Sequence, residues 1–129
     1  MKIIKEFKVT ELFLNKESDR FFVFGDNTLH KSTGGAASLR HHPRAIGFIT
    51  KKFPNNKPDS FYNDSDYWEV FHIEMRKLKK VLIANLNATF YISKLGAGLA
   101  NRNSIFEKII EPNLFDGLKY FKNVKLLWG

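Results

Sequence analysis

The sequence contains no cysteine, which excludes disulfide bonds, thiolate metal ligands and a cysteine nucleophile. No apolar run approaches the roughly 18 residues of a membrane-spanning helix, and no hydrophobic leader follows Met1, so we expect neither a membrane partner nor a signal peptide. These absences favour a cytoplasmic location. The 129 residues are expected to form a single domain, residues 1–129, with a core filled largely by 13 phenylalanines.

Several signatures of catalytic and cofactor sites are also missing. The Walker phosphate loop, the dinucleotide-binding G-x-G-x-x-G spacing and the Gly-x-Ser-x-Gly elbow do not occur. His41 and His42 are adjacent, so on a helix they point about 100° apart and do not readily share a metal. The sequence therefore predicts no metal site and no cofactor. His30 is instead a candidate for contact with a ribose or a phosphate.

Positive charge is in excess, with 21 basic and 13 acidic residues and a net charge of +8. This excess favours an anionic partner such as a nucleotide, a phosphate or a nucleic acid, although solubility alone is the alternative explanation. Residues 76–80 contain four cations at the expected C-terminal end of a helix, where they suit the helix dipole. Nucleic-acid contact is the alternative for this cluster. It ranks lower because the aromatic-rich sheet motif of common RNA-binding domains is absent.

Apolar periodicity predicts alternating strands and helices. The expected strands are residues 3–9, 21–24, 45–50, 89–93 and 124–128. The expected helices are residues 35–42, residues 66–80 with Asp66 and Glu69 as a capping pair, and a helix from 103 or 104 to about 110. Pro112 is expected either to break this last helix or to start a short second turn. This order predicts a three-layer α/β domain.

Two glycine-containing loops, residues 26–37 and 95–103, each follow an expected strand. In an open α/β sheet, ligands lie beyond the carboxyl ends of the strands. If the two strands are parallel neighbours, the loops face each other across one crevice, where backbone N–H groups can hold a diphosphate. The alternative is that the small residues serve only for close packing in the turns.

The loop motifs resemble those of a known family. Residues 27–29 followed by residues 34–37 resemble the first ligand loop of macro domains, which bind ADP-ribose. Residues 49–52, 56–58 and 93–99 are similar to one branch, the terminal ADP-ribose protein glycohydrolase, which removes ADP-ribose from acidic side chains. The similarity extends from about residue 5 to the C-terminus and implies a three-layer α/β/α macro-type domain with a mixed central sheet. The first loop is also similar to small phage-encoded proteins, which would place the chain in a host cytoplasm.

The resemblance implies roles for individual residues. Glu11 stands where macro domains have an aspartate that accepts a hydrogen bond from the adenine amino group, and Asn27 stands near the distal ribose. Lys51 matches the catalytic lysine that attacks the anomeric carbon of that ribose, although an ordinary cation beside a phosphate is the alternative. The ligand-binding positions implied for the two loops are Gly34, Gly35, Ala36, Gly96, Ala97, Gly98 and Leu99.

The chain departs from the family at its catalytic carboxylates. The glycohydrolase aspartate falls on Ala100, and Ala37 with Ser38 replaces the aspartate of the other hydrolytic branch. A lysine nucleophile must lose its proton, and glycosidic cleavage needs acid help at the leaving oxygen. Asp26 and Asp64 are candidate substitutes. The resemblance implies hydrolysis of ADP-ribosylated protein or of ADP-ribose 1″-phosphate, and the alternative is a module that only binds or sequesters ADP-ribose.

Overall fold

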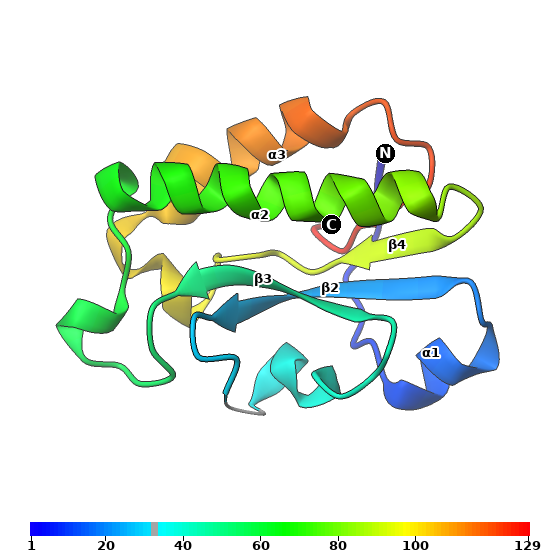
Figure 1. Ribbon diagram of the computed structural model, residues 1–129, viewed down its shortest axis with the longest axis horizontal. Coiled ribbons are helices and arrows are strands. Elements are labelled where there is room, and N and C mark those ends of the chain that lie inside the picture. The colour runs from blue at the N-terminus through cyan, green and yellow to red at the C-terminus, as the bar shows by residue number, and fades with distance from the viewer. Residues whose placement is uncertain (32–33) are drawn as a thin grey trace.

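Five strands form one sheet in the order β1-β5-β4-β2-β3 (Figure 1). The structure is a computed structural model that describes residues 1–31 and 34–129. The strands are β1 (Lys2–Ile3), β2 (Arg20–Asn27), β3 (Ala45–Lys51), β4 (Thr89–Ile92) and β5 (Val124–Leu126). The predicted α/β class is confirmed, but the expected mixed sheet is wrong, since all four strand pairs are parallel. A helical segment separates every two successive strands and returns the chain to the same end of the sheet.

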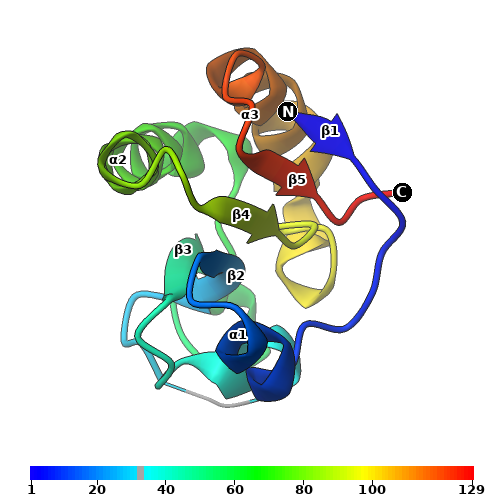
Figure 2. The same ribbon diagram turned by 90° about the vertical axis from the view of Figure 1, so that its right-hand side faces the viewer.

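Helical segments cover both faces of the sheet, as the predicted three layers require. Helices α2 (Asp64–Ala84) and α3 (Glu111–Leu118) lie on one face, and α1 (Glu11–Lys16) lies on the other with the 3₁₀ turn η1 (Gly35–Leu39) (Figures 1 and 2). Side chains alternate along β2, so that Val23 is buried in the core beneath α2 and α3, whereas Phe22 and Phe24 are buried in a second core beneath α1.

The N-terminal segment differs from its prediction. The expected strand over residues 3–9 is wrong, because β1 contains only Lys2 and Ile3, which pair with the edge of β5. Phe7 packs edge-on against Phe13 at a centroid distance of 5.1 Å, and this contact lies in the α1 layer. Helix α1 was not predicted. It begins after Thr10, whose hydroxyl oxygen accepts a hydrogen bond from the Phe13 N–H at 3.1 Å.

Helix α2 is longer at both ends than predicted. Asn63, rather than Asp66, is its N-cap: the Asn63 side chain accepts from the Asp66 N–H at 2.9 Å, and the Asp66 carboxylate accepts from the Asn63 N–H at 2.7 Å. This reciprocal pair is a capping box. The helix continues to Ala84, and its last turn contains no basic residue. The cations at positions 76–80 therefore lie before the turn in which a helix dipole acts.

Pro112 does not break the helix, and the other role expected for it, the start of a further helical turn, is confirmed. The 3₁₀ turn η3 (Leu99–Asn103) forms the end of the second glycine loop, and a π-helical turn η4 (Phe106–Ile110) leads directly into α3. Pro112 lies in the first turn of α3, where its missing N–H costs little. A third 3₁₀ turn, η2 (Pro58–Ser60), lies in the predicted loop before α2, and the expected helix over 35–42 is limited to η1.

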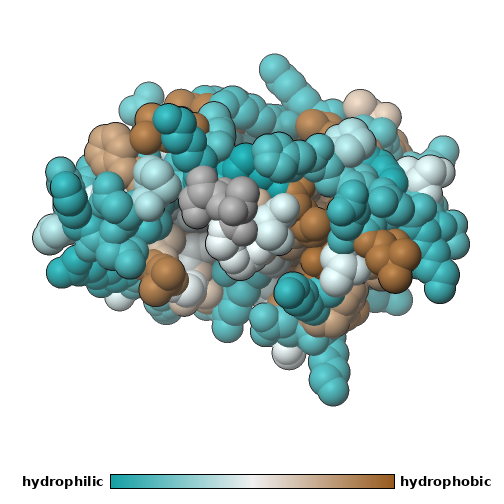
Figure 3. Space-filling model, turned by 90° about the horizontal axis from the view of Figure 1, so that it is seen from below, coloured by the Kyte–Doolittle hydropathy of each residue, from teal (hydrophilic) through white to brown (hydrophobic). Residues whose placement is uncertain are grey.

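The molecular surface is mostly hydrophilic on the side of α1 and η1, with hydrophobic residues in separate patches (Figure 3). Within residues 1–31 and 34–129, no helix combines the length and the apolar character needed to cross a membrane.

Candidate ligand-binding cleft

The cleft lies where the connections of the sheet diverge. From β2 the chain moves to β3 on one side, and from β4 it moves to β5 on the other side. Because β2 and β4 are parallel neighbours, the loops that follow them leave the same edge of the sheet in opposite directions. Such a switch point leaves a crevice between the loops. A cleft of about 710 Å³ lies there, lined by both glycine loops, so the predicted meeting of the two loops is confirmed.

Most of the predicted site residues line this cleft. Its volume falls within the range of about 300–1,000 Å³ that is usual for small-molecule sites. The predicted positions that line it are Asn27, Gly34, Gly35, Ala36, Lys51, Gly96, Ala97, Gly98 and Leu99, together with Ala100.

Glycines keep the walls of the cleft open. Gly35 has φ +58° and Gly96 has φ +74°, a left-handed conformation that side chains disfavour. Among the residues that the structure describes, none would lie within 4 Å of a Cβ atom built on Gly35 or on Gly98, apart from the chain neighbours of each glycine. An anion can therefore approach the main chain of both loops closely.

The carboxylate of Asp26 anchors the first loop. Its Oδ1 accepts from the Asn27 N–H at 2.8 Å and from Nη1 of Arg40 at 2.6 Å. Its Oδ2 lies 2.7 Å from Nδ1 of His30, and only 3% of the Asp26 side chain is exposed. Gly47 leaves room for this carboxylate, because the Cβ atom of any other residue there would lie only 2.5 Å from Asp26 Oδ2. Asp26 thus joins the beginning of the loop to its end.

Asn27 lines the cleft, but its side chain is bonded within the loop. Its Oδ1 accepts from the Leu29 N–H at 3.1 Å, and its Nδ2 donates to the Lys31 carbonyl at 2.7 Å. Arg40 donates to the same carbonyl at 3.1 Å. These contacts give Asn27 a positioning role in addition to the ligand contact that the sequence predicts. Residues 32 and 33 of this loop lie outside the described residues.

Lys51 ends β3 at an irregularity in the sheet. Asp26 pairs with Ile49, but Asn27 pairs with Lys51, so Thr50 forms a bulge beside the cleft. The Lys51 ammonium group donates to Asn56 Oδ1 at 3.3 Å and lies 5.0 Å from the centre of the Phe61 ring. Burial lowers the pKa of Lys51 below its ordinary value, which increases the fraction of neutral amine. A lysine nucleophile requires that neutral form.

The charges in the cleft favour an anionic ligand. Its basic residues are Lys31, Arg40, Lys51 and Lys94, and its acidic residues are Glu6 and Asp26. Of the two carboxylates proposed as substitutes for the one missing at Ala100, Asp26 lines the cleft. Asp64 lies in a different hollow at the start of α2, 3.9 Å from the Lys108 ammonium group.

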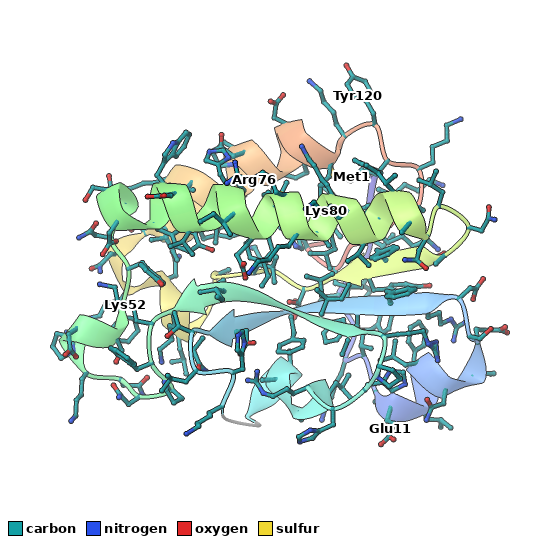
Figure 4. All side chains as sticks on the ribbon, in the orientation of Figure 1. Met1, Glu11, Lys52, Arg76, Lys80 and Tyr120 are labelled. Carbon is teal, nitrogen blue, oxygen red and sulfur yellow. The ribbon has the colours of Figure 1, made fainter. Side chains whose placement is uncertain are left out.

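Glu11 does not lie in the cleft. It is exposed in the first turn of α1 and lines a separate hollow with residues of η1 and the segment after it. Figure 4 shows it on the outer side of α1, directed away from the sheet. The cause is the helix that begins after Thr10, which the sequence did not predict and which turns Glu11 outward.

A second hollow, of about 470 Å³, continues the cleft and was missed by sequence reasoning. The two hollows share Glu6, Gly35, Ala36, Ser93 and Lys94. The apolar walls of the second hollow come from Phe7, Val9, Phe22 and Leu127. The apolar residues Phe7 and Val9 were the only sequence signal for this hollow, but their alternation with polar residues predicted a strand. Apolar walls with a carboxylate at one end suit a flat ring that has a polar edge.

The histidines lie in separate environments. His30 contacts Asp26, and Nε2 of His42 lies 2.7 Å from Oδ1 of Asn15. Among the described residues, no group of three or more histidine, aspartate or glutamate side chains could hold a metal ion.

Comparison with protein families shows what the chain is similar to. A model described as a family of unknown function (DUF7831) matches residues 4–108. Comparisons with curated proteins and with solved structures gave no match. The matched region includes both glycine loops and Lys51, and it ends before α3.

The contact between Gly47 and Asp26 generates a stability prediction. Gly47→Ala should lower the free energy of unfolding by about 1–3 kcal/mol, because the new methyl group overpacks a buried and bonded carboxylate. Gly117→Ala is the control: its Cβ would lie 2.7 Å from Cε of Met75, a flexible end that can shift, and alanine favours the helix by up to about 1 kcal/mol. Urea denaturation measures both variants. Equal stability of the Gly47→Ala and parent proteins would contradict the proposed packing.

Proposed function

The chain belongs to this family of unknown function, and we propose that it binds ADP-ribose, or a derivative of ADP-ribose, in the cleft between the two glycine loops. The observation that supports the proposal is the meeting of both loops in one cleft at the switch point of a parallel sheet. Open backbone at Gly35 and Gly98 and the basic residues of the cleft suit a diphosphate. The resemblance to macro domains supports the same ligand.

The shape of the cleft suggests an orientation for the ligand. With the diphosphate between the loops, the distal ribose extends toward Lys51 and Ala100. The adenine then occupies the second hollow, against Phe7 and beside Glu6. In this arrangement Glu6, rather than Glu11, is the carboxylate that accepts from the adenine amino group.

The proposed reaction begins with the Lys51 amine. Its nitrogen forms a bond to the anomeric carbon of the distal ribose while the bond from that carbon to the leaving oxygen breaks. Water must then attack the lysine–sugar adduct, and this step needs a group that accepts and returns a proton. Ala100 provides no such group, and Asp26 is already bonded to Arg40 and His30. The first step is therefore better supported than the second.

Binding without turnover is the second candidate function. Ala100 is only 8% exposed. The resemblance to the glycohydrolase implies that this alanine replaces the catalytic aspartate. A protein with this substitution can hold or sequester ADP-ribose with little release of product.

The two glutamates give a matched test of the adenine contact. Glu6→Ala should weaken binding of ADP-ribose by about 1–3 kcal/mol, the usual value for a hydrogen bond to a charged group, whereas Glu11→Ala should leave it unchanged. Calorimetry measures both, and a ligand without the adenine amino group should bind Glu6→Ala and the parent with similar affinity. An equal loss in the Glu11→Ala protein would contradict the assignment of Glu6.

The absence of a carboxylate at position 100 predicts a trapped intermediate. After incubation with ADP-ribosylated protein, a lysine–ADP-ribose adduct should accumulate and turnover should be slow, because hydrolysis of the adduct lacks proton transfer. Intact-mass measurement detects the adduct, and peptide mapping should place it on Lys51.

Three variants separate the steps of this reaction. Lys51→Ala should remove both adduct and turnover, whereas Lys57→Ala, which changes a nearby exposed lysine, should change neither. Ala100→Asp should increase turnover and reduce the adduct. Robust turnover by the Lys51→Ala protein would rule out the lysine mechanism.

A further inference from the structure

Positive charge is concentrated in the C-terminal part of the chain. Residues 75–129 contain ten of the 21 basic residues but only three of the 13 acidic residues. The N-terminal part, in contrast, is nearly balanced. Most of the net charge of +8 therefore comes from residues 75–129, which include the C-terminal half of α2 and the segments on either side of α3.

The cations of α2 are not explained by stability of the helix. Arg76, Lys79 and Lys80 precede the last turn, in which the helix dipole acts. Lys77 pairs with Glu74 at 3.3 Å, but Arg76, Lys79 and Lys80 form no ion pair with any residue that the structure describes. Their mutual repulsion costs free energy that no observed contact within the chain offsets.

The end of α3 extends this cationic surface. A Cβ atom on Gly117 would lie 3.6 Å from the Lys79 ammonium nitrogen, so the lysines of α2 adjoin α3. One turn later, Tyr120 is 87% exposed, and the Lys119 ammonium nitrogen lies 5.3 Å from the centre of its ring. Figure 4 shows Arg76, Lys80 and Tyr120 on the side of the sheet opposite Glu11.

A hollow beside Tyr120 completes the surface. Its volume is about 560 Å³, and Leu86, Tyr120 and Lys122 are among its lining residues. It lies next to the amino ends of β4 and β5, whereas the ligand cleft lies at the carboxyl ends. The two sites are therefore separate. One carboxylate on this surface, that of Asp116, is neutralised by Lys119 at 3.0 Å.

We propose that this basic face, formed by Arg76, Lys79, Lys80, Lys119, Tyr120 and Lys122, binds single-stranded nucleic acid. The unpaired cations contact successive phosphates, and a base stacks on the Tyr120 ring beside the hollow. A single strand fits better than a duplex because only an unpaired base offers its face to an exposed aromatic side chain. The proposal does not depend on ADP-ribose binding in the cleft.

Fluorescence anisotropy with a labelled 15-residue oligothymidylate tests the proposal on the full chain. The variant Arg76→Gln/Lys80→Gln/Lys122→Gln should bind more weakly and lower the slope of log affinity against log salt by about two, since each phosphate contact on a single strand contributes about 0.7. Tyr120→Ala should weaken binding at least about 5-fold through loss of stacking. The control Lys5→Gln/Lys16→Gln/Lys57→Gln removes the same charge from exposed positions elsewhere and should keep the slope.

Three results would overturn the proposal. The first is no binding of the oligonucleotide at low salt. The second is an equal loss of slope in the control variant, which would show that net charge alone attracts the oligonucleotide. The third is evidence against a stacked, unpaired base, in the form of tighter binding of a duplex of the same length or of unchanged binding by Tyr120→Ala. Circular dichroism confirms that each variant is folded, and none of the substituted side chains lines the ligand cleft or the hollow that continues it.

Discussion

The buried carboxylate of Asp26 is the interaction on which the cleft depends. It stands at the end of β2 and is bonded to the next backbone N–H, to the guanidinium of Arg40 at the far end of the loop, and to His30 between them. Removal of one partner from a buried ion pair typically costs about 3–5 kcal/mol, so the loop closes firmly on β2. Gly47 on the neighbouring strand leaves room for this group. The position of the first glycine loop, and with it one wall of the cleft, therefore follows from Asp26.

The central part of the fold could be predicted because its signals are local. Short apolar runs that end at polar residues or glycine mark β2, β3 and β4. The two glycine loops were expected to meet if β2 and β4 were parallel neighbours. Other parts depend on contacts between distant segments. Phe7 and Val9 alternate as in a strand but pack against the α1 layer, and this packing brings Glu6 into the cleft while the cap at Thr10 turns Glu11 away. No local pattern distinguishes these two glutamates.

The position at which α2 ends decides how its basic cluster, residues 76–80, is interpreted. In a helix that ended at residue 80, these cations would lie in the last turn and stabilise the helix dipole. Because α2 continues to Ala84, they lie before the last turn, on an open face. The chain then offers two surfaces for anions, and they differ in kind. The cleft presents backbone and a few cations to a compact ligand. The basic face presents long cationic side chains around Tyr120 to an extended ligand. The separation of these surfaces means that variants of one leave the other intact.

The central claim is that the two glycine loops together bind a diphosphate. Calorimetric titration with ADP-ribose tests this claim most directly when it compares the parent chain with Gly98→Ala and Gly98→Glu. The parent should bind, and Gly98→Ala should retain binding because a Cβ atom there would have no neighbour within 4 Å among the described residues. Gly98→Glu should abolish binding, since its side chain fills the space between the loops and its carboxylate repels the phosphates. Unchanged affinity in a folded Gly98→Glu protein would contradict the claim.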